Sequence, residues 1–180
     1  MGEVVLRHHL AQLGRDDVTV ESAGVSSEES GNPIDRRAQR VLADAGYDVP
    51  RRRAHRATPA ELREADLVLA MTVGHARRLR SMMAEAGADP AKVHLWREFD
   101  PSSGLTVAEG GVFGPGGVLG DDDAAGARAG KRGSISSQLY TSNGEYDVPD
   151  PWYGGPEDFD LTLETVEAAT PHIVTWLLDN

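Results

Sequence analysis

The sequence predicts an α/β protein with a parallel sheet, because segments with helical spacing alternate with short apolar segments typical of strands. The clearest helix covers residues 159–177, where apolar side chains recur every three or four positions. Pro171 lies inside it, so we expect a kink or a split there. The clearest strand covers residues 67–71, a continuous apolar run that we expect to be buried on both faces.

Three further elements are predicted in the first 50 residues. A helix with Leu6 and Leu10 on its apolar face ends at Gly14, and residues 18–21 alternate as a half-buried strand does. A second amphipathic helix ends at Gly46, which suits the left-handed position after a helix.

The middle of the chain carries clear helix start signals. Thr58 and Glu61 form a capping box, with a proline at the first helical position. Thr72 caps the next helix, which ends at Gly87, and residues 93–96 are typical of another short strand.

Residues 102–146 interrupt this alternation, since they are rich in Gly, Ser and Asp. A loop of this length is uncommon inside a compact domain. We therefore interpret residues 1–180 as a single domain with a mobile insertion at 102–146, which limited proteolysis should cut first. The glycines lack the spacing and the strand–turn–helix setting of a nucleotide-binding fingerprint.

Composition excludes several classes of function. The formal net charge of −11 argues against a nucleic-acid binder, and Arg51–Arg53 is interpreted as a solvated loop. The chain contains no cysteine, which excludes disulfides, thiolate metal sites and a thiol nucleophile among these residues. The six histidines show no metal-ligand spacing, so we expect neither metal nor cofactor. No apolar run reaches the roughly 20 residues of a membrane span and no secretory signal is evident, so we expect a cytoplasmic protein without membrane contact.

One segment carries possible chemistry, Asp150-Pro151-Trp152-Tyr153-Gly154-Gly155. It places a carboxylate on a proline-fixed turn beside two large aromatic side chains. Such a carboxyl group can donate a proton to a flat, bulky leaving group. The same residues also fit an ordinary surface turn, since Asp-Pro and Gly-Gly both punctuate loops.

Four segments together resemble the low-molecular-weight protein tyrosine phosphatase family. They are Ser22-Ala23-Gly24, His55-Arg56-Ala57, Ala65-Asp66-Leu67-Val68-Leu69-Ala70-Met71 and Val148-Pro149-Asp150-Pro151-Trp152-Tyr153-Gly154-Gly155. The resemblance covers about residues 1–101 and 147–180. It implies a four-stranded parallel sheet flanked by helices, whose first strand has no counterpart in this chain.

The resemblance also implies a function, the hydrolysis of phosphotyrosine in a protein or of a small aryl phosphate through a phosphocysteine, without a cofactor. Asp150 would be the general acid and then the general base, and Trp152 and Tyr153 would line the substrate cleft. Ser22 and His55 would support the phosphate-binding loop, although by themselves they fit a turn hydroxyl and a loop histidine equally well.

Two residues depart from the family pattern. Thr72 stands where the family usually has Asp, and it can still cap a helix. Trp152 stands where a tyrosine is common, and it keeps a flat apolar wall.

A larger departure lies at the start of the chain, which begins where the family's phosphate loop ends. The nucleophilic cysteine and the loop arginine therefore have no counterpart, and we expect the chain as given to be inactive. Three explanations are open: a mis-assigned start, a truncated or decayed gene, and a non-catalytic relative. We favour the first, which predicts an apolar strand and a Cys-X5-Arg loop encoded in frame upstream of Met1.

Two other functions are alternatives to phosphatase activity. A non-catalytic binding module would use the acidic, glycine-rich insertion to contact a partner. An arsenate reductase shares the fold, but it relays oxidation through further cysteines, and this chain has none.

Overall fold

The computed structural model describes residues 1–120 and 144–180, and the contacts among them define two compact units. The first unit comprises residues 1–56 and 148–180, and the second comprises residues 57–147. Each has its own buried apolar core. Whether the chain behaves as a single domain in solution stays a prediction.

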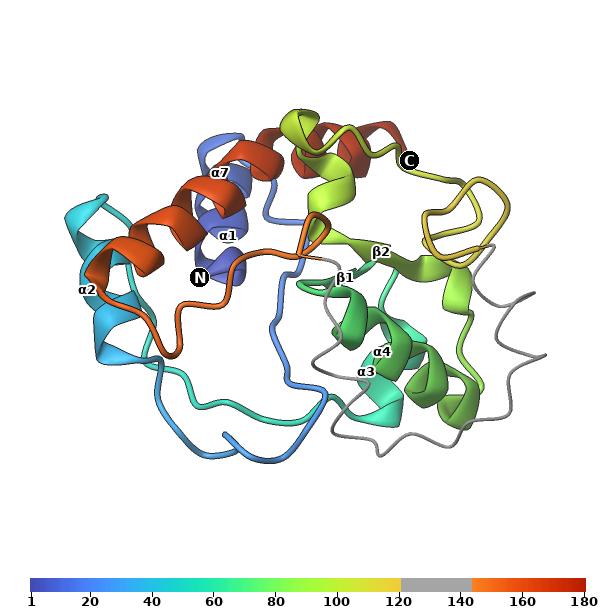
Figure 1. Ribbon diagram of the computed structural model, residues 1–180, viewed down its shortest axis with the longest axis horizontal. Helices are drawn as coiled ribbons and strands as arrows, with labels where there is room; N and C mark the ends of the chain where they lie inside the picture. The colour runs from blue at the N-terminus through green and yellow to red at the C-terminus, as the bar shows by residue number, and fades with distance from the viewer. Residues whose placement is uncertain (121–143) are drawn as a thin grey trace. The chain divides into compact units, whose positions relative to one another are not determined.

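The first unit is built on three helices: α1 (Gly2–Gln12), α2 (Arg36–Asp44) and α7 (Pro156–Asp179). Helix α7 packs against both α1 and α2 (Figure 1). Their facing sides bury large apolar residues, among them Val5, Leu10, Leu42, Val166 and Ile173. Each such side chain contributes about 1.5–3 kcal/mol when it leaves water, so this packing is the main source of stability in the unit.

Of the predicted kink or split at Pro171, the split is wrong, because helix α7 is continuous through this residue, and the kink stays a prediction. An interior proline costs a helix about 3 kcal/mol or more. Buried residues on both sides of it, Ala169 and Thr170 before and Ile173 and Val174 after, anchor the helix to its neighbours. Burial at this scale offsets the cost of the proline.

Residues 18–21 carry no strand assignment, so the strand predicted there is wrong. Alternation describes one segment, whereas a strand also needs a partner for its backbone groups. In the first unit the described pairing consists of two isolated bridges, a parallel one between Gly24 and Arg56 and an antiparallel one between Pro33 and Arg53.

The second unit holds the described sheet, which has two parallel strands, whereas the resemblance implies a sheet of four with only the first missing from this chain. β1 (Val68–Ala70) pairs with β2 (Val93–Leu95), with Val68 opposite Val93. Val68 and Leu69 are half-buried and Ala70 is buried, so the prediction of a strand buried on both faces is wrong for most of β1. The unit also contains two α-helices, α3 (Pro59–Glu64) and α4 (Val73–Ala86). Three short 3₁₀ helices follow: η1 (Pro90–Lys92), η2 (Trp96–Phe99) and η3 (Pro101–Ser103).

The predicted helix caps of the second unit are confirmed. Thr58 Oγ1 accepts from the Glu61 amide at 3.3 Å, and a Glu61 carboxylate oxygen accepts from the Thr58 amide at 2.7 Å. Thr72 Oγ1 accepts from the His75 amide at 3.0 Å at the start of α4. Gly87 follows that helix with a φ of 66°, as expected for a left-handed C-terminal residue.

The first part of the predicted insertion packs onto β2. The Val112 amide donates to the Val93 carbonyl oxygen at 2.8 Å, and the Leu119 amide donates to the Val112 carbonyl oxygen at 2.9 Å. Both Val112 and Leu119 are buried. Mobility of residues 102–146 stays a prediction, and residues 121–143 lie outside the described residues.

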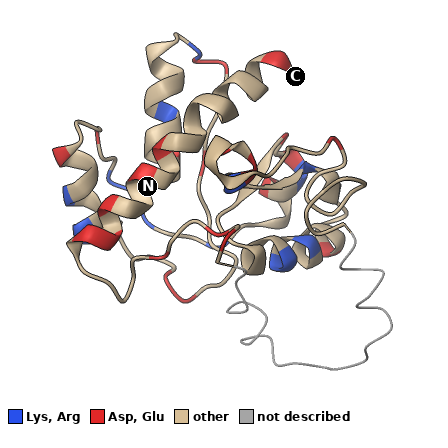
Figure 2. Ribbon diagram, turned by 45° about the horizontal axis from the view of Figure 1, so that its top comes forward, with Lys and Arg blue, Asp and Glu red and all other residues tan. Residues whose placement is uncertain are grey.

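Charged residues of both signs are interspersed over both units (Figure 2). Within residues 1–120 and 144–180, no helix is both long and apolar enough to cross a bilayer. The cytoplasmic location stays a prediction.

Candidate active site

The candidate site is centred on residues 149–155, here called the acid loop, which lead into α7 in the first unit. The loop backbone is tied to itself and to the first turns of the helix. The contacts are Thr162 Oγ1 to the Pro149 carbonyl oxygen at 3.0 Å, the Gly154 amide to the Pro151 carbonyl oxygen at 2.9 Å, and the Gly155 amide to Asp158 Oδ2 at 2.7 Å. A loop with its backbone groups paired in this way is pre-organised to hold a side chain.

Asp150 is exposed at the head of this loop. Its Oδ1 accepts a hydrogen bond from the Trp152 amide at 3.0 Å. This contact, two residues along the chain, is the turn that Asp side chains commonly make. An oxygen that accepts an N–H bond is disfavoured as the site of protonation, so Oδ2 is the oxygen suited to carry a transferable proton.

The two aromatic residues of the acid loop face solvent. Tyr153 is 95% exposed and Trp152 is 46% exposed. Exposed aromatic side chains next to a carboxyl group can contact a flat aryl group while the acid reaches its oxygen. The structure thus places three predicted site residues, Asp150, Trp152 and Tyr153, on one short loop.

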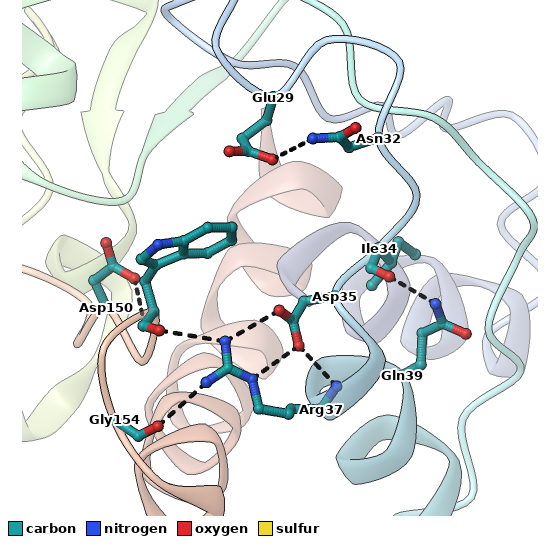
Figure 3. A network of polar contacts seen from close by, with 9 residues as sticks. Glu29, Asn32, Ile34, Asp35, Arg37, Gln39, Asp150 and Gly154 are labelled. Atoms are coloured by element: carbon teal, nitrogen blue, oxygen red, sulfur yellow. Dashed lines mark hydrogen bonds and ion pairs between the residues drawn. The ribbon is translucent and has the colours of Figure 1, made fainter.

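Arg37, in the first turn of α2, reaches across to the acid loop (Figure 3). Its Nη2 donates to the Trp152 carbonyl oxygen and its Nη1 to the Gly154 carbonyl oxygen, both at 3.2 Å. The guanidinium carbon lies 4.6 Å from the centre of the Phe159 ring. Phe159 is buried, so the cation stacks against the core side of the unit.

Asp35 completes this network from the position before α2. Its carboxylate accepts from Arg37 Nε and Nη2, each at 3.1 Å, and also from the Arg37 amide at 2.7 Å. The hydrogen bond from the Arg37 side chain is the main reason that the pKa of Asp35 lies below its usual value. The same bond raises the pKa of Arg37.

The sequence analysis missed Asp35 and Arg37. Asp35 carried a usable signal, because Asp is a favoured residue immediately before a helix. Arg37 did not, since nothing local distinguishes it from Arg36 beside it or indicates a partner more than 100 positions away.

Ser22 and His55 belong to a second cluster in the same unit. The Gly24 amide donates to the His55 carbonyl oxygen at 2.8 Å, which sets the two predicted segments side by side. The Ser22 hydroxyl donates to Glu3 Oε2 at 2.6 Å. Glu3, which the sequence analysis also missed, is a buried carboxylate at the start of α1.

Glu3 also accepts from two arginines. Arg52 donates from Nη1 to Glu3 Oε1, and Arg7 Nη1 lies 3.4 Å from the same oxygen. Arg53 donates to the Gly31 carbonyl oxygen at 2.6 Å. The interpretation of Arg51–Arg53 as a solvated loop is therefore wrong for Arg52, which is half-buried, whereas Arg51 and Arg53 are exposed. Burial of Glu3 explains this, because a buried carboxylate needs a charged or hydrogen-bonding partner.

No metal centre is found in the part of the chain that the structure describes, where no three His, Asp or Glu side chains gather as ligands would.

Solved structures identify the fold as that of small protein phosphatases. The chain aligns over 99% of its length with a protein tyrosine phosphatase from Entamoeba histolytica, covering 87% of that chain with a TM-score of 0.68 and 17% identity. It aligns over 98% of its length with a Drosophila arginine phosphatase, covering 87% of that chain with a TM-score of 0.68 and 15% identity. At these identities the likeness concerns the fold alone.

Sequence relatives then specify the family. The model of the low molecular weight phosphotyrosine protein phosphatase family matches residues 1–112. A low molecular weight protein-tyrosine-phosphatase of Streptomyces coelicolor is 31% identical over 171 residues, covering 94% of this chain and 80% of the relative. Low molecular weight protein-tyrosine phosphatase A of Mycobacterium tuberculosis is 29% identical over 178 residues, covering 98% and 82%. The chain belongs to the low molecular weight phosphotyrosine protein phosphatase family, which confirms the resemblance drawn from its motifs.

Proposed function

We propose that this chain carries the acid–base half of a phosphotyrosine phosphatase, in which Asp150 is first the general acid and then the general base. The observation that carries the proposal is the Asp150 carboxyl group itself. One of its oxygens is held by the Trp152 amide, and it stands on an anchored loop beside exposed Trp152 and Tyr153. Family membership supports the same reaction.

The proposed chemistry has two steps. A thiolate sulfur attacks phosphorus, the bond from phosphorus to the aryl oxygen breaks, and Asp150 Oδ2 gives its proton to the departing phenolate. The Asp150 carboxylate then takes a proton from water, whose oxygen attacks the phosphocysteine and releases phosphate and thiolate. Because the chain contains no cysteine, the thiolate must come from outside these 180 residues. The chain as given is therefore proposed to be inactive by itself.

Ser22 and His55 have supporting roles in this proposal. The Ser22 hydroxyl is fixed by Glu3, and the His55 backbone is fixed by the Gly24 amide. We propose that these segments brace the phosphate-binding loop and take no part in proton transfer.

The test compares two aryl phosphates in a protein that carries a Cys-X5-Arg loop before Met1. Asp150→Asn should lower kcat/KM, which reports the steps up to release of the phenol, by about 10²–10⁴-fold for phenyl phosphate, the range for losing a general acid. The loss should be smaller for p-nitrophenyl phosphate, because p-nitrophenolate departs without needing a proton. Residues 1–180 alone should turn over neither ester.

The matched control is Asp160→Asn, which removes an exposed carboxylate from α7. It should leave kcat/KM for both esters unchanged. An equal loss of kcat/KM in the Asp150 and Asp160 variants, or a loss in the Asp150 variant that is the same for both leaving groups, would exclude Asp150 as the acid.

One alternative keeps a specific observation in its favour. The lack of any cysteine is what a non-catalytic, phosphatase-like binding module would show. Coding sequence upstream of Met1 decides between the two, since a Cys-X5-Arg loop there supports the enzyme and its absence supports the binding module. The same lack of cysteine leaves arsenate reductase the weakest candidate.

A further inference from the structure

The guanidinium group of Arg37 makes more directed contacts than a structural surface arginine needs. Four of its five N–H groups point at acceptors: two at Asp35, one at the Trp152 carbonyl oxygen and one at the Gly154 carbonyl oxygen (Figure 3). One face of the group lies over the Phe159 ring. The guanidinium group is therefore held along its edges and on one face, although the Arg37 side chain is 41% exposed.

Asp35 sets the orientation of this fork. Its two oxygens take Nε and Nη2 side by side, which is the bidentate geometry that makes arginine–carboxylate pairs directional. The Asp35 carboxylate is itself held by the amide of residue 37 at the start of α2. The remaining N–H groups can then meet the acid loop in only one arrangement.

Trp152 connects this fork to the acid. Its carbonyl oxygen accepts from Arg37, while its own amide donates to Asp150 Oδ1. Both contacts depend on the placement of a single residue. A shift of Trp152 away from Arg37 would therefore also disturb the hydrogen bond that orients the Asp150 carboxyl group.

We propose that Arg37, oriented by Asp35, is a positioning residue for the general acid, acting through the backbone of Trp152 and Gly154. The inference rests on the proposed role of Asp150, and it adds a residue from α2 to a site otherwise built on the acid loop. Lysine can replace Arg37 only in part, since a single ammonium group lacks the fork that meets Asp35 and two carbonyl groups together.

The first experiment measures the anchoring itself and needs no catalysis. Amide hydrogen exchange is compared in residues 1–180 with Arg37→Gln, Arg37→Lys and the control Arg40→Gln. Arg40 lies on the same helix and pairs with Asp44 while remaining 83% exposed, so its replacement makes the same charge change away from the loop.

Arg37→Gln should speed exchange of the Trp152, Gly154 and Gly155 amides by at least about fivefold, with Arg37→Lys in between and Arg40→Gln unchanged. Amides of α4 in the other unit report whether the chain as a whole is weakened. Exchange at the acid loop that is unchanged, or that rises only together with exchange in α4, overturns the proposal.

The second experiment asks whether anchoring acts on the acid. In the protein that carries a Cys-X5-Arg loop, Arg37→Gln should lower kcat/KM for phenyl phosphate about tenfold and for p-nitrophenyl phosphate less. In the Asp150→Asn background it should have no further effect, because the group that it positions is gone. A loss that is equal for both esters, or one that multiplies with the Asp150→Asn loss, overturns the positioning role.

The two failures can be told apart. If Asp150→Asn itself leaves kcat/KM for phenyl phosphate unchanged, the proposed function fails, and with it any role of Arg37 in positioning an acid. The anchoring of the loop by Arg37 is decided separately by the exchange experiment.

Discussion

The placement of several polar side chains in this chain depends on partners that lie far away in the sequence. Glu3 meets Ser22 and Arg52, and Arg37 meets Trp152. The motifs predicted Asp150, Trp152 and Ser22 as site residues, but not the distant residues that contact them. Local spacing cannot reveal such partners, since the chain has to fold before they meet.

The Asp35–Arg37 pair predicts a pH dependence. The pKa of Asp35 is lower in the folded protein than its value of about 3.9 in an unfolded chain, chiefly because Arg37 donates to it. The stabilisation of the folded protein by the ionised Asp35 carboxylate is therefore complete above the pKa of the unfolded chain. It is lost as pH falls through the lower pKa of the folded protein. Asp35→Asn keeps a good helix cap but removes the charge.

We expect Asp35→Asn to lower the free energy of unfolding at pH 7 by less than about 1 kcal/mol, since the pair is partly exposed. The difference between variant and wild type should shrink as pH falls below about 4. Urea unfolding at pH 7, 5 and 3 measures it. A difference that stays constant over this range would contradict the assignment.

Replacing Glu3 should lower the free energy of unfolding at neutral pH by more than replacing Asp35 does, because the Glu3 side chain is only 7% exposed. Glu3→Gln keeps the shape but leaves Arg52 without its counter-charge. We expect the free energy of unfolding to fall by about 1–3 kcal/mol, the range for disrupting a buried charged hydrogen bond. Glu28→Gln, an exposed replacement in the same unit, should change it little, and equal effects in urea unfolding would show that the Glu3 cluster is not stabilising.

Elements were predictable where their signals are local. The Thr58 box, the Thr72 cap and the glycines after α2 and α4 lie within a few residues of the helix ends that they define. The prediction of a strand at residues 18–21 failed, since strand pairing depends on a neighbour elsewhere in the chain. The burial of β1 was overestimated for the same reason.

Helix α4 shows how a distant residue completes a local signal. Asp147 Oδ1 accepts from the Val73 amide at 2.7 Å, at the first residue of the helix, and its side chain is buried. Thr72 satisfies the His75 amide two positions further along. Two of the amides that a helix start leaves unpaired are thus covered from two parts of the chain.

We expect Asp147→Ala to lower the free energy of unfolding by about 1–3 kcal/mol, because it leaves a buried amide without its acceptor. Thr72→Ala should cost about 1 kcal/mol, the usual value of a helix cap. Urea unfolding together with exchange of the Val73 and His75 amides measures both. Glu145→Ala, at an exposed position nearby in the chain, is the control, and a cost equal to that of Asp147→Ala would contradict the capping role.

At the scale of the whole molecule, the composition and motifs predict one domain, whereas the contacts fall into two compact units. The chain crosses between the units twice, between Arg56 and Ala57 and again between Asp147, which caps α4, and Val148, which leads into the acid loop. Whether the two units unfold together depends on the free energy that couples them. A variant that weakens only the second unit can decide this.

Gly111→Ala is suited to that test. Gly111 has a φ of +71°, and a Cβ atom there would lie 2.4 Å from the Ala91 carbonyl oxygen, next to β2. Gly116 has a similar φ of +79° with open space around it, so Gly116→Ala carries the same backbone cost without the clash. The backbone cost is about 1–2 kcal/mol for each, and the clash should make Gly111→Ala clearly the more destabilising.

The reporters are amide exchange in α7 for the first unit and in α4 for the second, followed through urea unfolding. A single cooperative domain predicts that Gly111→Ala lowers the unfolding midpoint of both helices equally. A lower midpoint for α4 with an unchanged one for α7 would show that the units unfold separately and that the one-domain prediction is wrong. In that case Asp150, Trp152 and Arg37 would keep their arrangement when the second unit is unfolded, because every described contact among them lies within the first.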